Sequence, residues 1–245
     1  MIPSTTKISS YRLFVISLFL GIGAILLIRF CPAASPLATI LIWPAFLSGA
    51  NSVRELARYG LGTGTSSIGY WGAALGATAV YIMHLVEPGL GSFLGIGVAF
   101  LGGAITGLCA QKIIRMRIPV MIRESAMLAA STAVAISFLL ELFPSCLLTI
   151  SPLIYIAVTL AVIHPFNGSM GAGENKRRTI RLAAAEASMT TALLGSLAAM
   201  GGAHGVGLSV AAVSCAGFII FAVLWFNSVK DDIYEIRWTG FPAEE

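Results

Sequence analysis

Long, continuous runs of apolar residues are the feature that most limits what this chain can fold into. A helix needs about 20 apolar residues to cross a bilayer, and runs of about that length recur along the whole chain. Such runs must fold as helices, because the hydrocarbon core offers no hydrogen-bond partner to an exposed backbone. A β-barrel would need short strands of alternating polarity, which these continuous runs lack. The sequence therefore predicts an all-α, polytopic transmembrane helical bundle.

The apolar runs divide into about eight predicted spans. They cover residues 11–30, 36–50, 66–87, 90–111, 124–143, 146–164, 180–200 and 206–228. The second span is short and contains Pro44, and a proline inside a helix removes one hydrogen bond and kinks the segment. This span is therefore either a full crossing or a re-entrant segment, which would leave six or seven crossings. We expect one integral membrane domain over residues 1–245, with a short cytoplasmic tail at 230–245.

The few charged residues indicate how the spans are oriented. They make up only 11% of the chain, against about 25% in soluble domains, and Lys and Arg concentrate in the cytoplasmic loops of membrane proteins. If all spans cross from a cytoplasmic N-terminus, every Lys and Arg except Arg29 lies on the cytoplasmic side. We therefore expect a cell-membrane protein, surrounded by lipid, with both termini in the cytoplasm. A re-entrant second span would move only the N-terminus outside. The basic residues form short separate clusters without an aromatic surface, so no nucleic-acid partner is expected.

Glycine patterns suggest both a repeat and close helix packing. Gly62-Thr63-Gly64 and Gly171-Ala172-Gly173 each precede a helical hairpin. Two tandem four-helix halves would explain this arrangement, and internal repeats are common in transporters. The pairs with G-x-x-x-G spacing are Gly72 and Gly76, Gly91 and Gly95, and Gly103 and Gly107. Such pairs serve either a partner interface or packing within the chain.

Glu186 is the best candidate for a functional side chain, because ionisable residues inside a membrane are costly. It lies within the seventh span, and Thr190, four residues on, shares its helix face. A carboxylate beside a hydroxyl suits a hard cation such as Na⁺, which prefers oxygen ligands. A proton relay would use the same groups. The structural alternative is an interfacial Glu186 paired with Arg178 or Arg181.

The other polar groups form no recognisable catalytic or metal-binding pattern. Glu124 and Glu141, near the two ends of the fifth span, are interpreted as interfacial. The histidines are scattered and the cysteines have no C-x-x-C spacing, so no metal site beyond a transient Na⁺ is expected. Pro165 is expected to end the sixth span, with Asn167-Gly168 forming a turn.

The glycine-rich run at residues 60–67 does not match a nucleotide-binding loop. Its expected role is to let the backbone enter a helical cavity, where amides and carbonyls could contact an ion or a partner.

Four segments stand out for their residue combinations and their order. They are Gly62-Thr63-Gly64-Thr65-Ser66-Ser67-Ile68-Gly69, then Ile118-Pro119-Val120-Met121, then His164-Pro165-Phe166-Asn167 followed by Glu174-Asn175-Lys176-Arg177-Arg178-Thr179, and last Asp232-Ile233-Tyr234 followed by Thr239-Gly240-Phe241-Pro242. Together they resemble the C subunit of the tetrahydromethanopterin S-methyltransferase of methanogenic archaea. The resemblance runs from about residue 60 to the end, and the helix pattern extends it to nearly the whole chain.

This resemblance implies a membrane subunit of a multi-subunit enzyme of methanogenesis and one-carbon metabolism, not catalytic alone. The enzyme moves a methyl group from tetrahydromethanopterin to coenzyme M through a corrinoid on a partner subunit, and the transfer drives Na⁺ out of the cell. The C, D and E subunits are thought to carry the ion. We therefore expect Na⁺ but no corrinoid on this chain, with the D and E subunits and the corrinoid-bearing subunit as partners. Gly62, Gly64, His164 and Asn167 are the candidate cytoplasmic contacts to these partners.

Two other functions remain open from the sequence. Short outer loops and glycines inside the spans also suit a stand-alone secondary transporter of ions or solutes. A purely structural subunit would only pack against neighbours that carry the ion.

Overall fold

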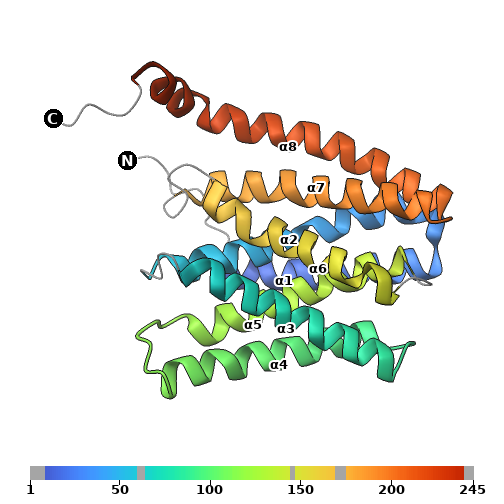
Figure 1. The fold of residues 1–245 in the computed structure, drawn as a ribbon, viewed down its shortest axis with the longest axis horizontal. Helices are drawn as coiled ribbons and strands as arrows, with labels where there is room; N and C mark the ends of the chain where they lie inside the picture. The colour runs from blue at the N-terminus through green and yellow to red at the C-terminus, as the bar shows by residue number, and fades with distance from the viewer. Residues whose placement is uncertain (1–8, 60–63, 144–146, 169–174, 240–245) are drawn as a thin grey trace.

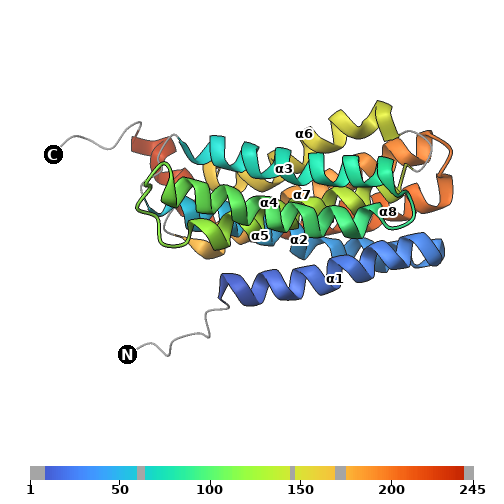
Figure 2. The same ribbon diagram turned by 90° about the horizontal axis from the view of Figure 1, so that it is seen from below.

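The chain folds into a bundle in which successive helices run in opposite directions (Figure 1; Figure 2). The structure, a computed structural model, describes residues 9–59, 64–143, 147–168 and 175–239. The described helices are α1 (Ser10–Phe30), η1 (Pro32–Ala34, a 3-10 turn), α2 (Ser35–Ala57), α3 (Gly64–Val86), α4 (Gly91–Lys112), α5 (Met121–Glu141), α6 (Leu147–Gly168), α7 (Lys176–Met200) and α8 (His204–Thr239). No strand occurs in this part of the chain. The predicted all-α bundle is confirmed.

The helices have the length and composition of membrane spans. Six of them are long and apolar enough to cross a bilayer over their described residues, namely α1, α2 with η1, α4, α5, α7 and α8. The other two, α3 and α6, have 23 and 22 residues, also more than the roughly 20 that a crossing needs. The protein is therefore a multi-pass membrane protein.

Two predicted helix ends differ from the structure at prolines. The second span does not stop at residue 50, because α2 is one continuous helix of 23 residues that contains Pro44. Its length and continuity favour a full crossing over a re-entrant segment. Pro165 likewise does not end the sixth span, since α6 continues through it to Gly168. A proline in a membrane helix costs one backbone hydrogen bond, and neighbouring helices and local adjustments compensate for this loss.

Helix α5 lies at the centre of the bundle, in contact with α1, α2, α3, α4 and α6. Its span is 94% buried, compared with 28% for that of α8, which packs chiefly on α7. Close approach to α5 requires glycine on α4: a Cβ at Gly103 would lie 2.5 Å from the Ser125 carbonyl oxygen, and one at Gly107 2.5 Å from Ile122 Cα. These G-x-x-x-G glycines thus serve packing within the chain. The suggested four-helix halves are not separate in space, because α5 packs among the first four helices.

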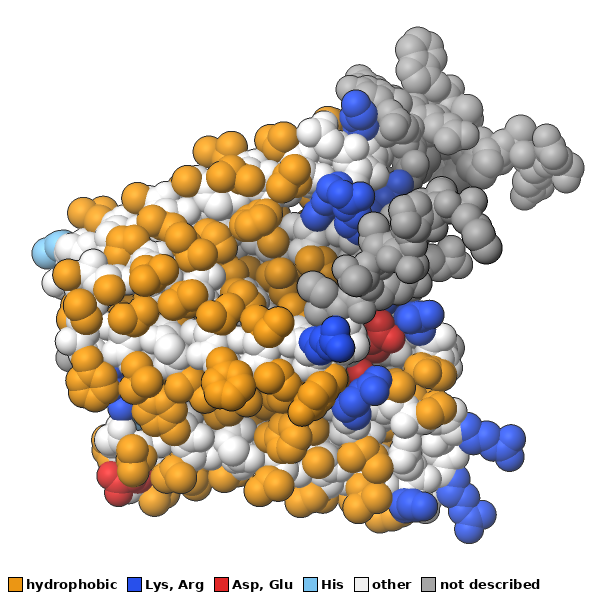
Figure 3. Space-filling model, turned by 180° about the vertical axis from the view of Figure 1, so that it is seen from behind, with side chains coloured by type: hydrophobic (Ala, Val, Ile, Leu, Met, Phe, Trp, Pro, Cys, Tyr) orange, Lys and Arg blue, Asp and Glu red, His pale blue; other side chains and the backbone are white. Residues whose placement is uncertain are grey.

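The two ends of the bundle differ in charge, with an apolar belt between them (Figure 3). The basic end is formed by the starts of α1, α3, α5 and α7, the ends of α2, α4, α6 and α8, and the α4–α5 connection. Its described basic residues are Arg12, Arg54, Arg58, Lys112, Arg115, Arg117, Arg123, Lys176, Arg177, Arg178, Arg181 and Lys230. At the opposite end, Arg29 pairs with Glu141 at 2.5 Å and donates to the Gly89 carbonyl oxygen at 2.6 Å.

The predicted tail at 230–245 begins inside α8, which continues to Thr239. Residues 240–245 lie outside the described part of the chain.

Candidate functional site

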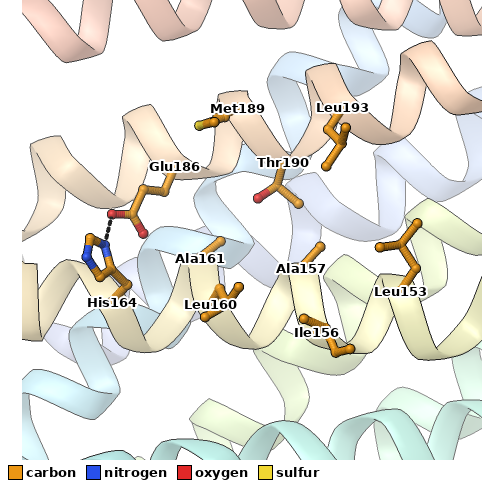
Figure 4. Close-up of a pocket in the computed structure, with 10 residues that line it drawn as sticks. All are labelled: Leu153, Ile156, Ala157, Leu160, Ala161, His164, Glu186, Met189, Thr190 and Leu193. Atoms are coloured by element: carbon orange, nitrogen blue, oxygen red, sulfur yellow. Dashed lines mark hydrogen bonds and ion pairs between the residues drawn. The ribbon is translucent and has the colours of Figure 1, made fainter.

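Helices α6 and α7 enclose a groove of about 440 Å³, here called the α6–α7 groove (Figure 4). It is lined by Leu153, Ile156, Ala157, Leu160, Ala161 and His164 of α6, and by Glu186, Met189, Thr190 and Leu193 of α7. These positions recur every three or four residues, so they form one face of each helix. Small alanines on α6 leave room between the helices. The groove is therefore an apolar slot with three polar side chains.

Glu186 and His164 form the polar end of this groove. Glu186 Oε1 and His164 Nδ1 are hydrogen-bonded across the two helices. The Glu186 side chain is 17% exposed, while that of His164 is 58% exposed. The imidazole thus partly shields the carboxylate at the groove mouth. The alternative pairing of Glu186 with Arg178 or Arg181 does not occur; Arg181 instead donates to the Leu224 carbonyl oxygen at 3.1 Å.

Thr190 lies one turn deeper on the Glu186 face of α7, as the four-residue spacing predicted. Its side chain and that of Glu186 both point from α7 toward α6 (Figure 4). Nearby hydroxyls are turned elsewhere: Ser188 donates to the Ala184 carbonyl oxygen, and Thr191 Oγ1 lies 2.8 Å from Ser214 Oγ. Thr190 therefore provides the hydroxyl of this groove.

Glu186 is the eleventh residue of α7, so it lies roughly 15 Å along the helix from its start. A carboxylate at that depth is costly unless it is paired, protonated or bound to a cation. The groove offers all three possibilities, because the imidazole can donate to the carboxylate, and the carboxylate and the Thr190 hydroxyl are oxygen ligands. The arrangement can hold a proton or a small hard cation.

Of the predicted partner contacts, only His164 has a described side chain. Asn167 lies one turn further along α6, and its side chain is outside the described residues. Gly64 is the first residue of α3, and Gly62 also lies outside the described residues. The predicted partner contacts at Gly62, Gly64, His164 and Asn167 all stay predictions.

A second polar cluster lies where α2 and α5 reach the basic end. Arg54 and Arg58 pair with Glu55 at 2.8 and 3.3 Å, and Arg123 pairs with Glu124 at 2.8 Å. Glu124 is completely buried, although the sequence suggested only an interfacial residue. Its Oε2 has no hydrogen-bond partner in the described part of the chain. Each of these ion pairs lies within one helix and its cap.

The sequence did not reveal that His164 and Glu186 are partners. Their positions in the sequence could have indicated the pair, because His164 and Glu186 both lie near the cytoplasmic ends of consecutive predicted spans. A short connection makes consecutive helices antiparallel neighbours, and residues near the same end then lie at similar depths. Which faces meet depends on tertiary packing, which neither helix encodes alone.

Comparison with known proteins gives one consistent family. The family of the C subunit of tetrahydromethanopterin S-methyltransferase matches residues 3–245. The protein of that name from Methanothermobacter thermautotrophicus is 29% identical over 266 residues, which cover 99% of this chain and 97% of that protein. The one from Methanopyrus kandleri is 29% identical over 249 residues, covering 95% and 88%. The similarity therefore extends over essentially the whole length of both chains.

Proposed function

The chain belongs to the family of the tetrahydromethanopterin S-methyltransferase C subunit, and from this premise we propose that it forms part of the Na⁺ route of that complex. In this proposal the α6–α7 groove holds Na⁺ transiently, with Glu186 and Thr190 as oxygen ligands. Methyl transfer takes place on partner subunits, one of which carries the corrinoid. This chain, together with the D and E subunits, forms the membrane part through which Na⁺ crosses when methyl transfer takes place.

One observation carries the proposal: a carboxylate and a hydroxyl face the same groove between two membrane helices. An unpaired charge is expensive there, so a buried carboxylate needs a cationic or hydrogen-bonding partner. His164 supplies one such partner. A Na⁺ ion that displaces the imidazole would supply another, and exchange between the two would let the ion enter and leave.

The positive-inside rule supports the orientation. The basic end of the bundle then faces the cytoplasm, and both ends of the chain lie on that side. His164 lies on the cytoplasmic side of the groove, so it would meet an ion that arrives from the cytoplasm before Thr190 does.

The test is Na⁺ transport by the whole complex in liposomes, with Glu186→Gln in this chain. The substitution keeps the size of the side chain and removes its charge. We expect Na⁺ uptake driven by methyl transfer to fall at least about tenfold, which corresponds to ~1.4 kcal/mol of lost ion stabilisation. Glu186→Asp should restore part of the transport. The matched control is Glu87→Gln, an exposed carboxylate at the opposite end of the bundle, which should have no effect.

Unchanged Na⁺ transport by a fully assembled Glu186→Gln complex would remove this groove from the ion route. The chain would then be a structural subunit. A chain that purifies without any partner subunit would contradict the complex itself and favour a stand-alone transporter.

A further inference from the structure

A second groove lies on a different face of the bundle, where α1, α4 and α5 meet. It has a volume of about 500 Å³ and is here called the α1–α4–α5 groove. It is lined by Tyr11, Phe14, Val15, Leu18, Phe19, Ile96, Gly97, Phe100, Arg123, Met127 and Ala130. We propose that this groove binds one hydrocarbon chain of an anionic membrane lipid, with the lipid head group held by Arg123.

The apolar part of the groove has the dimensions of a single chain. Phe14 and Phe100 stack with their ring centroids 6.0 Å apart. Gly97 leaves the groove open, because a Cβ built there would meet nothing within 4 Å. An apolar groove of about 500 Å³ has room for a hydrocarbon chain.

The polar part of the groove lies at the depth of a lipid head group. Arg123 is the third residue of α5 and Tyr11 is the second residue of α1, so both lie at the basic end of the bundle. Met127 and Ala130 follow one and two turns deeper along the same face of α5. A lipid chain lying along these residues would place its head group beside Arg123.

Arg123 has donors left for a phosphate. Its Nε and Nη2 both donate to Glu124 Oε1, at 3.0 and 2.8 Å, and this contact fixes the guanidinium plane. Its Nη1 makes no hydrogen bond with the described residues, and the side chain is 52% exposed. Arginine binds phosphate well because its planar group presents several donors. Arg12 adds positive charge, since it is on the α1 face of Val15 and Phe19.

Charge complementarity thus selects the head group. Basic pockets next to membrane helices on the cytoplasmic side bind anionic head groups, and each Lys or Arg near the surface contributes measurably. Glu124 pairs with Arg123 and neutralises part of its charge, but its side chain is completely buried and has no surface that lipid could contact. Neutral and zwitterionic lipids would fill the apolar slot without this added attraction.

The test uses the purified complex in nanodiscs that contain a photoreactive phosphatidylglycerol or the matching photoreactive phosphatidylcholine. After illumination, labelled peptides of this chain are identified by mass spectrometry. We expect phosphatidylglycerol to label peptides from α1, α4 and α5, and Arg123→Gln to reduce that labelling about fivefold. Arg123→Lys should retain part of it. Arg117→Gln, a matched basic residue outside the groove, should leave it unchanged.

A second variant tests the groove with Arg123 unchanged, in case Arg123→Gln does not fold. Gly97→Leu fills the apolar slot and leaves Arg123 and Glu124 in place, so it should reduce labelling by both lipids. Equal labelling by the two lipids in the unmodified complex would refute the head-group site. Cross-links from these helices to a partner subunit in place of lipid would show that a protein occupies the groove. None of these outcomes depends on Na⁺ transport.

Discussion

The two grooves of this bundle are built alike and differ in the sign and depth of their charge. Their volumes are about 440 and 500 Å³, and apolar side chains form most of each wall. The α6–α7 groove contains a carboxylate, Glu186, on the eleventh residue of its helix, whereas the other contains a guanidinium, Arg123, on the third. The first charge is thus roughly 15 Å from the helix start and the second only about 3 Å.

This difference in depth separates an ion-binding site from an anchoring site. A charge near a helix end can reach water and lipid head groups at little cost. A charge two to three turns inside cannot, so it needs a specific partner. The side chains that pair with the two charges differ in the same way. Arg123 pairs with the adjacent residue on its own helix, whereas Glu186 pairs with a residue on another helix. Under the two proposals, grooves of similar size would bind a cation in one place and an anionic lipid in the other.

Reversing the charge of the deep site should have the largest effect. Glu186→Lys would give the α6–α7 groove the sign of the other groove and repel Na⁺. We expect Na⁺ uptake by the reconstituted complex to fall more than about 100-fold, equivalent to ~2.8 kcal/mol, because an ammonium group would repel the cation where a carboxylate now attracts it. Glu87→Lys at the opposite end should change uptake by less than about twofold. Measurable transport through an assembled Glu186→Lys complex would argue against an ion at this site.

Removing the partner of Glu186 should change the affinity for Na⁺. In this proposal Na⁺ displaces the imidazole of His164, which is hydrogen-bonded to Glu186 Oε1. His164→Ala removes the competing group, and a hydrogen bond to a charged group contributes ~1.5–3 kcal/mol. We expect the half-saturating Na⁺ concentration to fall about tenfold, equivalent to ~1.4 kcal/mol. His204→Ala, which changes a histidine at the opposite end of the bundle, is the control.

An unchanged half-saturating Na⁺ concentration in His164→Ala would mean that the imidazole does not compete with Na⁺.

The sequence predicted the bundle well because each span is encoded locally. Apolar length defined the spans, and the spacing of Glu186 and Thr190 placed both on one face of α7. The errors lie at helix ends. The second span was expected to end at residue 50, yet α2 continues to Ala57, and most residues of this more polar last part are buried in the bundle. Hydropathy alone cannot separate a polar helix end from a loop.

The tertiary contacts could not be predicted in the same way. His164 was expected to contact a partner subunit, and its bond to Glu186 depends on which faces of α6 and α7 meet. The α1–α4–α5 groove combines Tyr11, Phe100 and Arg123 from three helices that are distant in the sequence. Such sites result from packing around α5, where small residues set the distance between the helices.

Removing the hydroxyl of the deep groove should have a smaller effect than removing the charge. Thr190→Val keeps the branched shape and the packing, so it tests only the oxygen. A neutral hydrogen-bonding group contributes ~1 kcal/mol, and we expect the half-saturating Na⁺ concentration to rise about fivefold. Thr190→Ser retains the oxygen and should stay within about twofold of the unmodified complex. Equal Na⁺ affinity in the valine and serine variants would exclude Thr190 as a ligand.

Filling the second groove should have the smallest effect on transport, and it tests whether the two grooves are independent. A leucine at Gly97 has room, because a Cβ there meets nothing within 4 Å. We therefore expect Gly97→Leu to lose lipid labelling while Na⁺ uptake stays within about twofold. Gly103→Leu is the contrasting variant, since its Cβ would lie 2.5 Å from the Ser125 carbonyl oxygen and should destabilise the complex. A large fall in Na⁺ uptake by a stable Gly97→Leu complex would show that lipid at one groove controls the ion at the other, since no residue lines both grooves.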